Sequence, residues 1–292
     1  MFETTKEFKI TTLIENDSDD NDILLCEHGL SLYIEADGKR ILFDTGKSGD
    51  FIKNAPMLNV DLSNIDYVIL SHGHYDHSGG FVELVNKYDG KFNLIMGEKF
   101  FNKKYKLTEE KTYRYNGNSF DEKFLHEKDI STKYISEDII HITENIIIFS
   151  NFERKNNFEV LNSNFVVKNE EGYVLDEFSD EIVLGIKIEK GLLVILGCSH
   201  IGVMNILETI AERIGMPVYG IIGGTHLIQA EETRLDNTFK FIKEKDIKII
   251  GVSHCTGEIA VRELERRFGE RFFRNNTGKE IEFCDSDTCR LK

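Results

Sequence analysis

The sequence predicts an α/β fold in which two mixed β-sheets pack face to face and helices cover their outer sides. Two observations predict it. Apolar runs with strand character alternate with helical segments in both halves of the chain, and each half also contains an antiparallel hairpin. Because hairpins give antiparallel pairs and strand–helix–strand units give parallel ones, each half is expected to form one mixed sheet with helices against it.

The N-terminal half supplies the first sheet. Its hairpin turns at Asp37-Gly38, a dipeptide that tolerates the positive φ angles of a tight turn. Helical spacing follows at Phe81, Leu84 and Val85, which fall on one face of a helix. The expected elements are strands over 8–14, 31–36, 41–46, 66–71 and 92–97 and a helix over 79–88.

The second sheet is expected after residue 181, where regular alternation resumes. Its hairpin turns at Lys190-Gly191, and strands and helices then alternate. The expected elements are strands over 181–189, 191–197, 217–224 and 247–253 and helices over 203–213, 231–245 and 257–268.

Between the two halves, residues 98–180 are rich in Lys, Glu, Asn and aromatic side chains and contain only short apolar runs. We expect a single domain over 1–292 in which this range is an insertion or lid. The apolar runs 146–150 and 165–167 are expected to form strands within the insertion or at its edge. Such segments over the active face of a scaffold commonly set substrate choice.

The net charge of −15 limits the possible partners. Binding to duplex DNA or to an anionic membrane needs a basic face, so neither partner is expected. A small-molecule substrate, including an anionic one, remains possible because a few placed cations or a metal ion can reverse the local field. The sequence does not predict an oligomeric state.

The location expected from the sequence is the cytoplasm. The N-terminus lacks a basic segment followed by an apolar one, and the longest apolar run, 192–196, is far too short to cross a bilayer. The odd number of five cysteines argues against a full disulfide framework.

The segment Ser71–Gly80 carries the strongest chemical signal. It places three histidines and an aspartate within six residues, directly after an apolar strand. Gly73 lets the backbone bend so that His72 and His74 reach one ion, and Asp76 and His77 can then face a second. Imidazole nitrogen and carboxylate oxygen suit zinc, iron(II) or manganese, and we expect one or two ions, with zinc first and iron or manganese as alternatives.

This motif and four others, in the same order, resemble the metallo-β-lactamase superfamily. The resemblance extends from about residue 8 to 256, and within the superfamily it is similar to the 7,8-dihydropterin-6-methyl-4-(β-D-ribofuranosyl)aminobenzene-5′-phosphate synthase group. It implies an αββα sandwich with metals at the sheet ends. The motifs are FDTG at 43–46, HxHxDH at 72–77, GCSH at 197–200, GGTHL at 223–227 and HCTG at 254–257.

The resemblance also implies roles for individual residues. Asp44 would hold the ligand loop through hydrogen bonds. His254 matches the late histidine ligand, and His200 lies where most members carry a bridging aspartate, so we expect it to be a ligand. The implied metal ligands are His72, His74, Asp76, His77, His200 and His254.

Two further residues are candidates for substrate contact. His226 ends an apolar strand after Gly223-Gly224, and we expect it to contact substrate or transfer a proton, with a hydrogen-bonded strand-end histidine as the alternative. Arg154 lies where this group often carries a Gly-Glu-Ile-Pro-Arg-like run, which makes it a candidate anion clamp or a plain surface arginine.

Other histidines and cysteines are expected to be ordinary residues. No motif surrounds His126 or His141, which we expect to be surface or lid side chains. Cys198 and Cys255 adjoin expected ligands, but buried thiols are common and need no function.

The expected function is that of a metal-dependent hydrolase. A metal-bound hydroxide would attack an ester or phosphoester of a small molecule, with Asp76 and His226 as catalytic residues. One alternative is a pterin-related transferase or synthase of the group named above. The other is a metal-containing binding or regulatory protein with vestigial catalysis.

Overall fold

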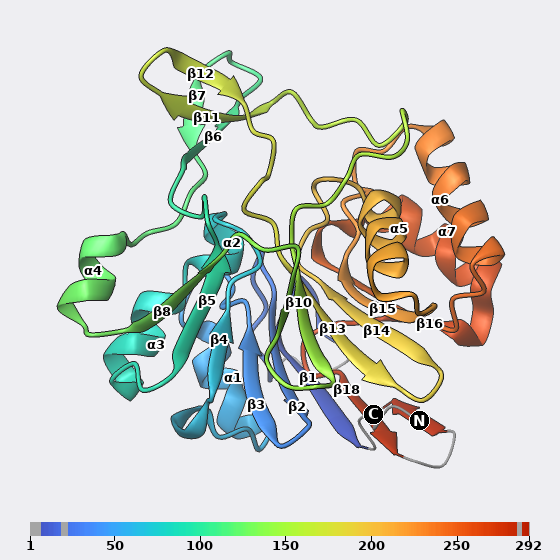
Figure 1. Ribbon diagram of the computed structural model, residues 1–292, viewed down its shortest axis with the longest axis horizontal. Coiled ribbons are helices and arrows are strands. Elements are labelled where there is room, and N and C mark those ends of the chain that lie inside the picture. The colour runs from blue at the N-terminus through green and yellow to red at the C-terminus, as the bar shows by residue number, and fades with distance from the viewer. Residues whose placement is uncertain (1–6, 19–22, 285–287, 292) are drawn as a thin grey trace.

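The computed structural model describes residues 7–18, 23–284 and 288–291, and it confirms the predicted pair of mixed sheets with outer helices (Figure 1). The ends of the predicted domain, at residues 1 and 292, lie outside the described residues. In the described residues the first sheet has the order β19 (Thr288–Leu291), β18 (Glu280–Cys284), β1 (Phe8–Ile14), β2 (Ser31–Ala36), β3 (Lys39–Phe43), β4 (Tyr67–Ile69), β5 (Asn93–Gly97) and β8 (Ser131–Ile135).

The second sheet is built from the C-terminal half and part of the middle of the chain. β13 (Val183–Ile188) and β14 (Gly191–Leu196) pair antiparallel, whereas β14, β15 (Val218–Gly224) and β16 (Ile249–Ser253) run parallel, so the carboxyl ends of these three parallel strands lie at one edge. The order is β17 (Phe272–Arg274), β16 (Ile249–Ser253), β15 (Val218–Gly224), β14 (Gly191–Leu196), β13 (Val183–Ile188), β10 (Ile146–Phe149) and β9 (Ile139–His141).

Helices cover the outer faces of both sheets (Figure 1). The predicted helix over 79–88 is shorter in the structure, because the chain first forms a separate turn of helix and passes through Gly79-Gly80 before α3 begins. The helices are α1 (Asp50–Met57), α2 (Tyr75–Ser78), α3 (Phe81–Tyr88), α4 (Glu122–Glu127), α5 (Val203–Ile214), α6 (Glu232–Glu244) and α7 (Glu258–Phe268), with 3₁₀ turns at Leu62–Asn64, His254–Thr256 and Gly269–Arg271.

Strand β14 shows how the sequence produces four layers. All six of its residues are buried, and successive side chains of a strand point to opposite faces. Leu193 and Ile195 pack with residues of the first sheet, in the layer between the sheets. Leu192, Val194 and Leu196 pack on the other face, against α5, α6 and α7. A strand buried on both faces needs this continuous apolar run.

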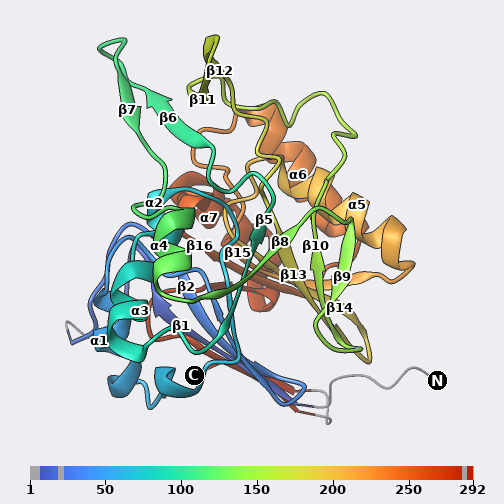
Figure 2. The same ribbon diagram turned by 60° about the vertical axis from the view of Figure 1, so that its left-hand side comes forward.

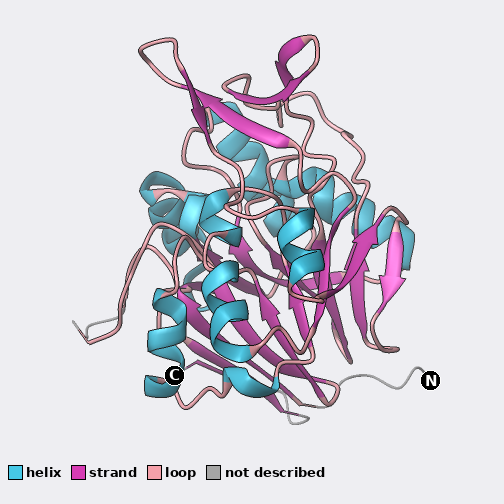
Figure 3. Ribbon diagram, turned by 90° about the vertical axis from the view of Figure 1, so that its left-hand side faces the viewer, coloured by secondary structure: helices cyan, strands magenta, loops and turns pink. Residues whose placement is uncertain are grey.

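A third, smaller sheet stands apart from the other two, and we call it the arm sheet. It consists of β12 (Gly172–Leu175), β11 (Phe165–Asn169), β6 (Lys103–Leu107) and β7 (Tyr113–Tyr115). Figures 2 and 3 show it projecting from one end of the molecule. The range 98–180 therefore forms the arm sheet and also gives β8, β9 and β10 to the main sheets, where β8 and β9 are edge strands and β10 lies between β9 and β13.

Some elements were not expected from the sequence. They include α1 and α4, the strands β6, β7, β8, β9 and β12 of the range 98–180, and the C-terminal strands β17, β18 and β19. The strand predicted over 41–46 ends at Phe43, because Asp44 adopts a φ of +60° that a strand cannot contain. In the described part of the chain, no helix has the length and apolar character needed to span a membrane.

Candidate metal centre

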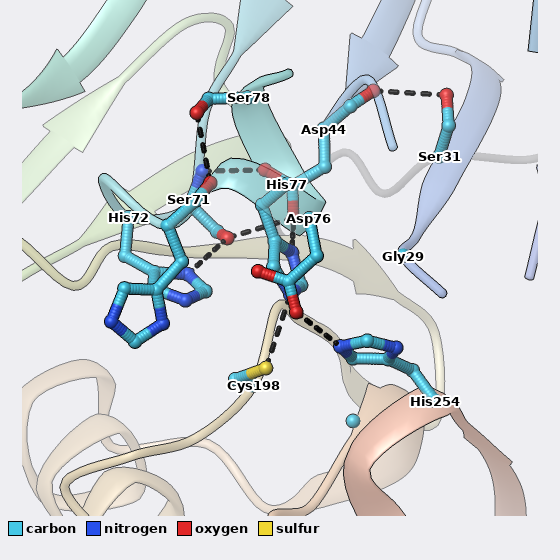
Figure 4. Close-up of polar contacts among 12 residues, drawn as sticks. Gly29, Ser31, Asp44, Ser71, His72, Asp76, His77, Ser78, Cys198 and His254 are labelled. Carbon is cyan, nitrogen blue, oxygen red and sulfur yellow. Dashed lines mark hydrogen bonds and ion pairs between the residues drawn. The ribbon is translucent and has the colours of Figure 1, made fainter. Parts of the chain in front are cut away.

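Four strand ends place the predicted site residues together. The HxHxDH segment follows β4 of the first sheet, and three segments of the second sheet face it. Cys198 and His200 follow β14, His226 follows β15, and His254 follows β16. Because these three strands are parallel neighbours, their following residues meet at one edge, opposite the loop after β4 (Figure 4).

His72, His74 and His200 form a compact group. Their rings lie 4.7–4.9 Å apart between centroids, and a nitrogen of each lies within 4.8 Å of a nitrogen of the others. All three side chains are buried, and the Nε2 atom of each has no hydrogen-bond partner among the described residues. Burial lowers the pKa of each imidazole well below its usual value, so all three are neutral.

This group fits a divalent metal ion. Buried polar atoms without partners are costly, and three neutral imidazole nitrogens are a ligand set that zinc and related ions accept. The ring of His72 is also oriented for this task, since its Nδ1 lies 2.9 Å from the Ser71 hydroxyl and leaves Nε2 for the ion.

Asp44 holds the loop that carries these ligands. Its Oδ1 accepts a hydrogen bond from the Ser71 backbone N–H at 2.7 Å, and its Oδ2 accepts one from the Ser71 hydroxyl at 2.7 Å. The same Oδ2 lies 2.6 Å from His77 Nδ1 (Figure 4). A carboxylate on one ring nitrogen fixes the tautomer and directs the other nitrogen inward.

His77 therefore directs Nε2 toward the centre, where it meets a thiol. Nε2 lies 3.0 Å from Cys198 Sγ, and both side chains are buried. Burial opposes a charge on this ring, but the Asp44 carboxylate outweighs it and raises the pKa of His77. His72, His77 and Cys198 have the spacing of a possible metal group.

Cys198 is one of the residues that the sequence analysis did not assign to the centre. Its sulfur takes part in three possible metal groups, with His72 and His77, with His200 and His226, and with His254 and Cys255. The signal was present in the sequence, since Cys198 lies in the GCSH motif where most superfamily members carry a bridging aspartate. A thiolate can replace a carboxylate as a ligand.

Asp76 and His254 define the other side of the centre. Asp76 Oδ2 lies 3.2 Å from His254 Nε2 and 3.2 Å from His28 Nε2. Burial acts to raise the pKa of Asp76, but hydrogen bonds from these histidines hold it well below its usual range. Its Oδ1 has no partner in the described structure. His28, an exposed residue that the sequence did not single out, belongs to a further possible ligand group here with Asp76 and His254.

Two buried glutamates support the ligand loops of the second sheet. Glu181 accepts hydrogen bonds from the backbone N–H groups of His200 and Ile201, at 2.9 and 3.1 Å. Glu15 accepts one from the backbone N–H of His254. Burial raises the pKa of both glutamates to about 7. Neither was predicted, because Glu15 meets His254 across 239 positions and Glu181 belongs to no motif.

His226 lies at the edge of the centre and Arg154 outside it. The His226 ring is half-buried, 4.2 Å from the His200 ring, and its Nδ1 has no partner among the described residues. It lines a cavity of about 600 Å³ together with His200. Arg154 is exposed and does not line this cavity, so nothing in the described contacts places it at the centre.

Two aromatic rings cover the imidazoles from the direction of the arm sheet. The Phe178 ring stacks on His200 with centroids 4.0 Å apart and planes within 6°. Phe165, in β11, lies 5.3 Å from His74 and 6.0 Å from His226. These apolar rings exclude water from the histidines on that side.

Comparison with known proteins agrees with this architecture. A family model described as the metallo-beta-lactamase superfamily matches residues 25–104. A curated relative from Methanocaldococcus jannaschii, 7,8-dihydropterin-6-methyl-4-(beta-D-ribofuranosyl)-aminobenzene-5'-phosphate synthase, is 34% identical over 94% of this chain and 96% of its own length. An uncharacterized protein of the same organism is 32% identical over 87% of this chain and 93% of its own length.

A solved structure shows the same fold. The crystal structure of Tm1679, a metal-dependent hydrolase of the beta-lactamase superfamily, superposes with a TM-score of 0.82 and 30% identity over 95% of this chain and 100% of that one. The chain belongs to the metallo-β-lactamase superfamily. Its homologues include metal-dependent hydrolases and the synthase named above.

Proposed function

We propose that this protein is a metal-dependent hydrolase that cleaves an ester or phosphoester bond of a small molecule. The observation that carries the proposal is the convergence of three neutral, buried imidazoles, each with an unpartnered Nε2, beside a cavity open to a small molecule. His72, His74 and His200 would hold one ion. Asp76, His77, Cys198 and His254 would hold a second.

The proposed metal is zinc, with iron or manganese as the alternatives. A bound ion of this class supplies a Lewis acid and a hydroxide nucleophile at neutral pH, because it lowers the pKa of bound water to about 7. Thiolate, imidazole and carboxylate ligands together suit zinc.

The residues of the chain supply orientation and proton transfer. Asp76 is ionised, because hydrogen bonds from His28 and His254 hold its pKa low, and its unpartnered Oδ1 can accept a hydrogen bond from the attacking water. His226 lies on the cavity side of the centre, where its Nδ1 can donate a proton to the leaving oxygen. Phe165 and Phe178 keep other water away.

Metal content and turnover, measured on one preparation, test the proposal. Protein purified without added metal should contain one to two transition-metal ions per chain by elemental analysis. It should hydrolyse at least one member of a panel of phosphoesters, lactones and thioesters, and chelation should remove the activity. The absence of stoichiometric metal, even after anaerobic reconstitution, would contradict the central claim.

A second candidate function is a synthase reaction, and a specific observation favours it. The synthase from Methanocaldococcus jannaschii is 34% identical over nearly the whole of both chains, which is more than a shared fold requires. The two functions differ in their need for a second substrate. Product formation that depends on an acceptor molecule other than water would favour the synthase, and turnover with water alone would favour the hydrolase.

A further inference from the structure

The cavity beside the candidate metal centre is lined by one arginine, Arg234, whose positive charge the proposed function does not use. It has a volume of about 600 Å³ and lies between the segment around residues 157–164 and the start of α6. His200 and His226 line it on the side of the centre, and Arg234, in the first turn of α6, lines it as well. The other polar side chains that line it include those of Asn162, Gln229 and Thr233.

Arg234 is an unusual arginine in this structure. It is half-buried, and its Nε and Nη2 atoms are inaccessible to solvent and have no hydrogen-bond partner among the described residues. Burial also lowers the pKa of its guanidinium. Arg213 provides the contrast, because it is half-buried too but donates to the backbone oxygens of Ser150 and Asn151, both at 2.6 Å.

No carboxylate of the described residues forms an ion pair with Arg234. The nearest acidic influence comes from Glu159, but this carboxylate accepts hydrogen bonds from the backbone N–H groups of Met204 and Asn205 and from the Asn156 amide. Glu159 therefore caps α5. Glu231, which also lines the cavity, is exposed, so water screens its charge.

We propose that Arg234 binds an oxyanion of the substrate, a phosphate or a carboxylate, in this cavity. A guanidinium carries paired N–H donors that match two oxygens of such a group. The Thr233 hydroxyl and the amides of Asn162 and Gln229 offer further donors around it. The substrate would thus place its anion on Arg234 and its scissile bond beside His200 and His226. This inference rests on the proposed function, because the cavity opens on the same histidines.

With this proposed role, Arg234 replaces Arg154 as the candidate residue for binding an anion. The sequence suggested Arg154, which is exposed and does not line the cavity. Arg234 gave no signal in the sequence, since it belongs to no motif and its neighbours in α6 are ordinary helical residues. Its place becomes apparent only when β15 and α6 bring it beside the strand ends.

Binding of small non-hydrolysable probes tests the role of Arg234. Calorimetry on the metal-loaded protein should detect phenylphosphonate or benzoate, and Arg234→Gln should weaken the affinity at least tenfold. The neutral probe benzamide should show no such change. Arg234→Lys should recover part of the affinity, and Lys240→Gln, on the exposed side of the same helix, should behave as the unmodified protein.

The arms of this experiment separate the possible outcomes. A loss confined to phenylphosphonate identifies a phosphate, and a loss confined to benzoate identifies a carboxylate. Equal anion affinity in Arg234→Gln and the unmodified protein, or no anion binding by either, overturns the inference. Repeating the titration after chelation removes direct anion–metal contact, and the effect of Arg234 should persist. Absence of metal in the purified protein would instead contradict the proposed function.

Discussion

The histidine cluster and the arm sheet are built in opposite ways. The cluster consists of buried side chains at the ends of strands from both main sheets, and the core behind those strands fixes its geometry. The strands of the arm sheet pair with neither main sheet in the described residues, although Phe165 at its base joins the core outside the second sheet, and Tyr113, Tyr115 and Tyr173 are exposed on it. From this difference we expect that the scaffold would set metal binding and that the arm sheet would vary with the substrate.

The two regions are nevertheless connected through one buried cation. Lys104, in β6 of the arm sheet, is only 1% exposed and donates to Asp176 at 2.7 Å and to Asp180 at 2.8 Å. Asp180 in turn accepts a hydrogen bond from the Gly73 backbone N–H, between His72 and His74. The base of the arm sheet is thus linked to the loop that carries the candidate ligands His72 and His74.

The largest effect is expected from removing a ligand of the buried cluster. His72→Ala or His74→Ala should lower metal affinity by more than about 100-fold, since even the loss of a supporting group around a metal ligand costs 10–100-fold. Elemental analysis and turnover measure this. His126→Ala is the matched control, because His126 is exposed and distant from the cluster. Equal metal content in all three variants would show that the cluster does not hold the ion.

His226 lies between the histidine cluster and the cavity, so its substitution distinguishes a role in metal binding from a role in turnover. His226→Ala should leave metal content unchanged and lower turnover by about 10²–10⁴-fold, as expected for a lost proton donor or substrate contact. A fall in metal content equal to that of His200→Ala would make it a ligand, which its spacing with Cys198 and His200 allows. Loss of thermal stability alone would leave it a structural residue.

Much of the buried cluster could be predicted because its signals are local. HxHxDH gathers four polar residues in six positions, and His200, His226 and His254 each follow an apolar strand. The parallel register of β14, β15 and β16 then brings those three segments together.

The contacts that the sequence could not predict join distant residues. His77 meets Cys198 across 121 positions, and Lys104 meets Asp176 and Asp180 across 72 and 76. Lys104 lies in a charged stretch where a surface position is the usual expectation, and only the paired carboxylates make its burial possible. Pairings of this kind depend on the fold and leave no periodicity in the sequence.

The next largest effect is expected from removing Lys104, which links the arm sheet to the loop of the histidine cluster. Lys104→Met leaves two buried carboxylates without their cation, and it should lower the free energy of unfolding by about 3–5 kcal/mol. Metal affinity should fall as well, because Asp180 holds Gly73. Thermal unfolding with and without chelator measures both, and the exposed neighbour gives the control Lys103→Met. If Lys104→Met and Lys103→Met have the same melting temperature, the ion pairs of Lys104 with Asp176 and Asp180 do not couple the arm sheet to the histidine cluster.

The smallest effect is expected at the tip of the arm sheet, where Tyr113 stacks on Tyr173 with ring centroids 3.7 Å apart and planes within 10°. Aromatic pairs contribute about 0.5–1.5 kcal/mol, and both rings are partly solvated, so Tyr113→Ser should change stability by less than about 1 kcal/mol and leave metal content unchanged. Limited proteolysis should still distinguish the arm sheet from the histidine cluster, because the first cut should fall within 98–180 and should come sooner in Tyr113→Ser. If this range closes over substrate, phenylphosphonate should slow that cut. Equal cleavage with and without that probe would show that the arm sheet is not a lid.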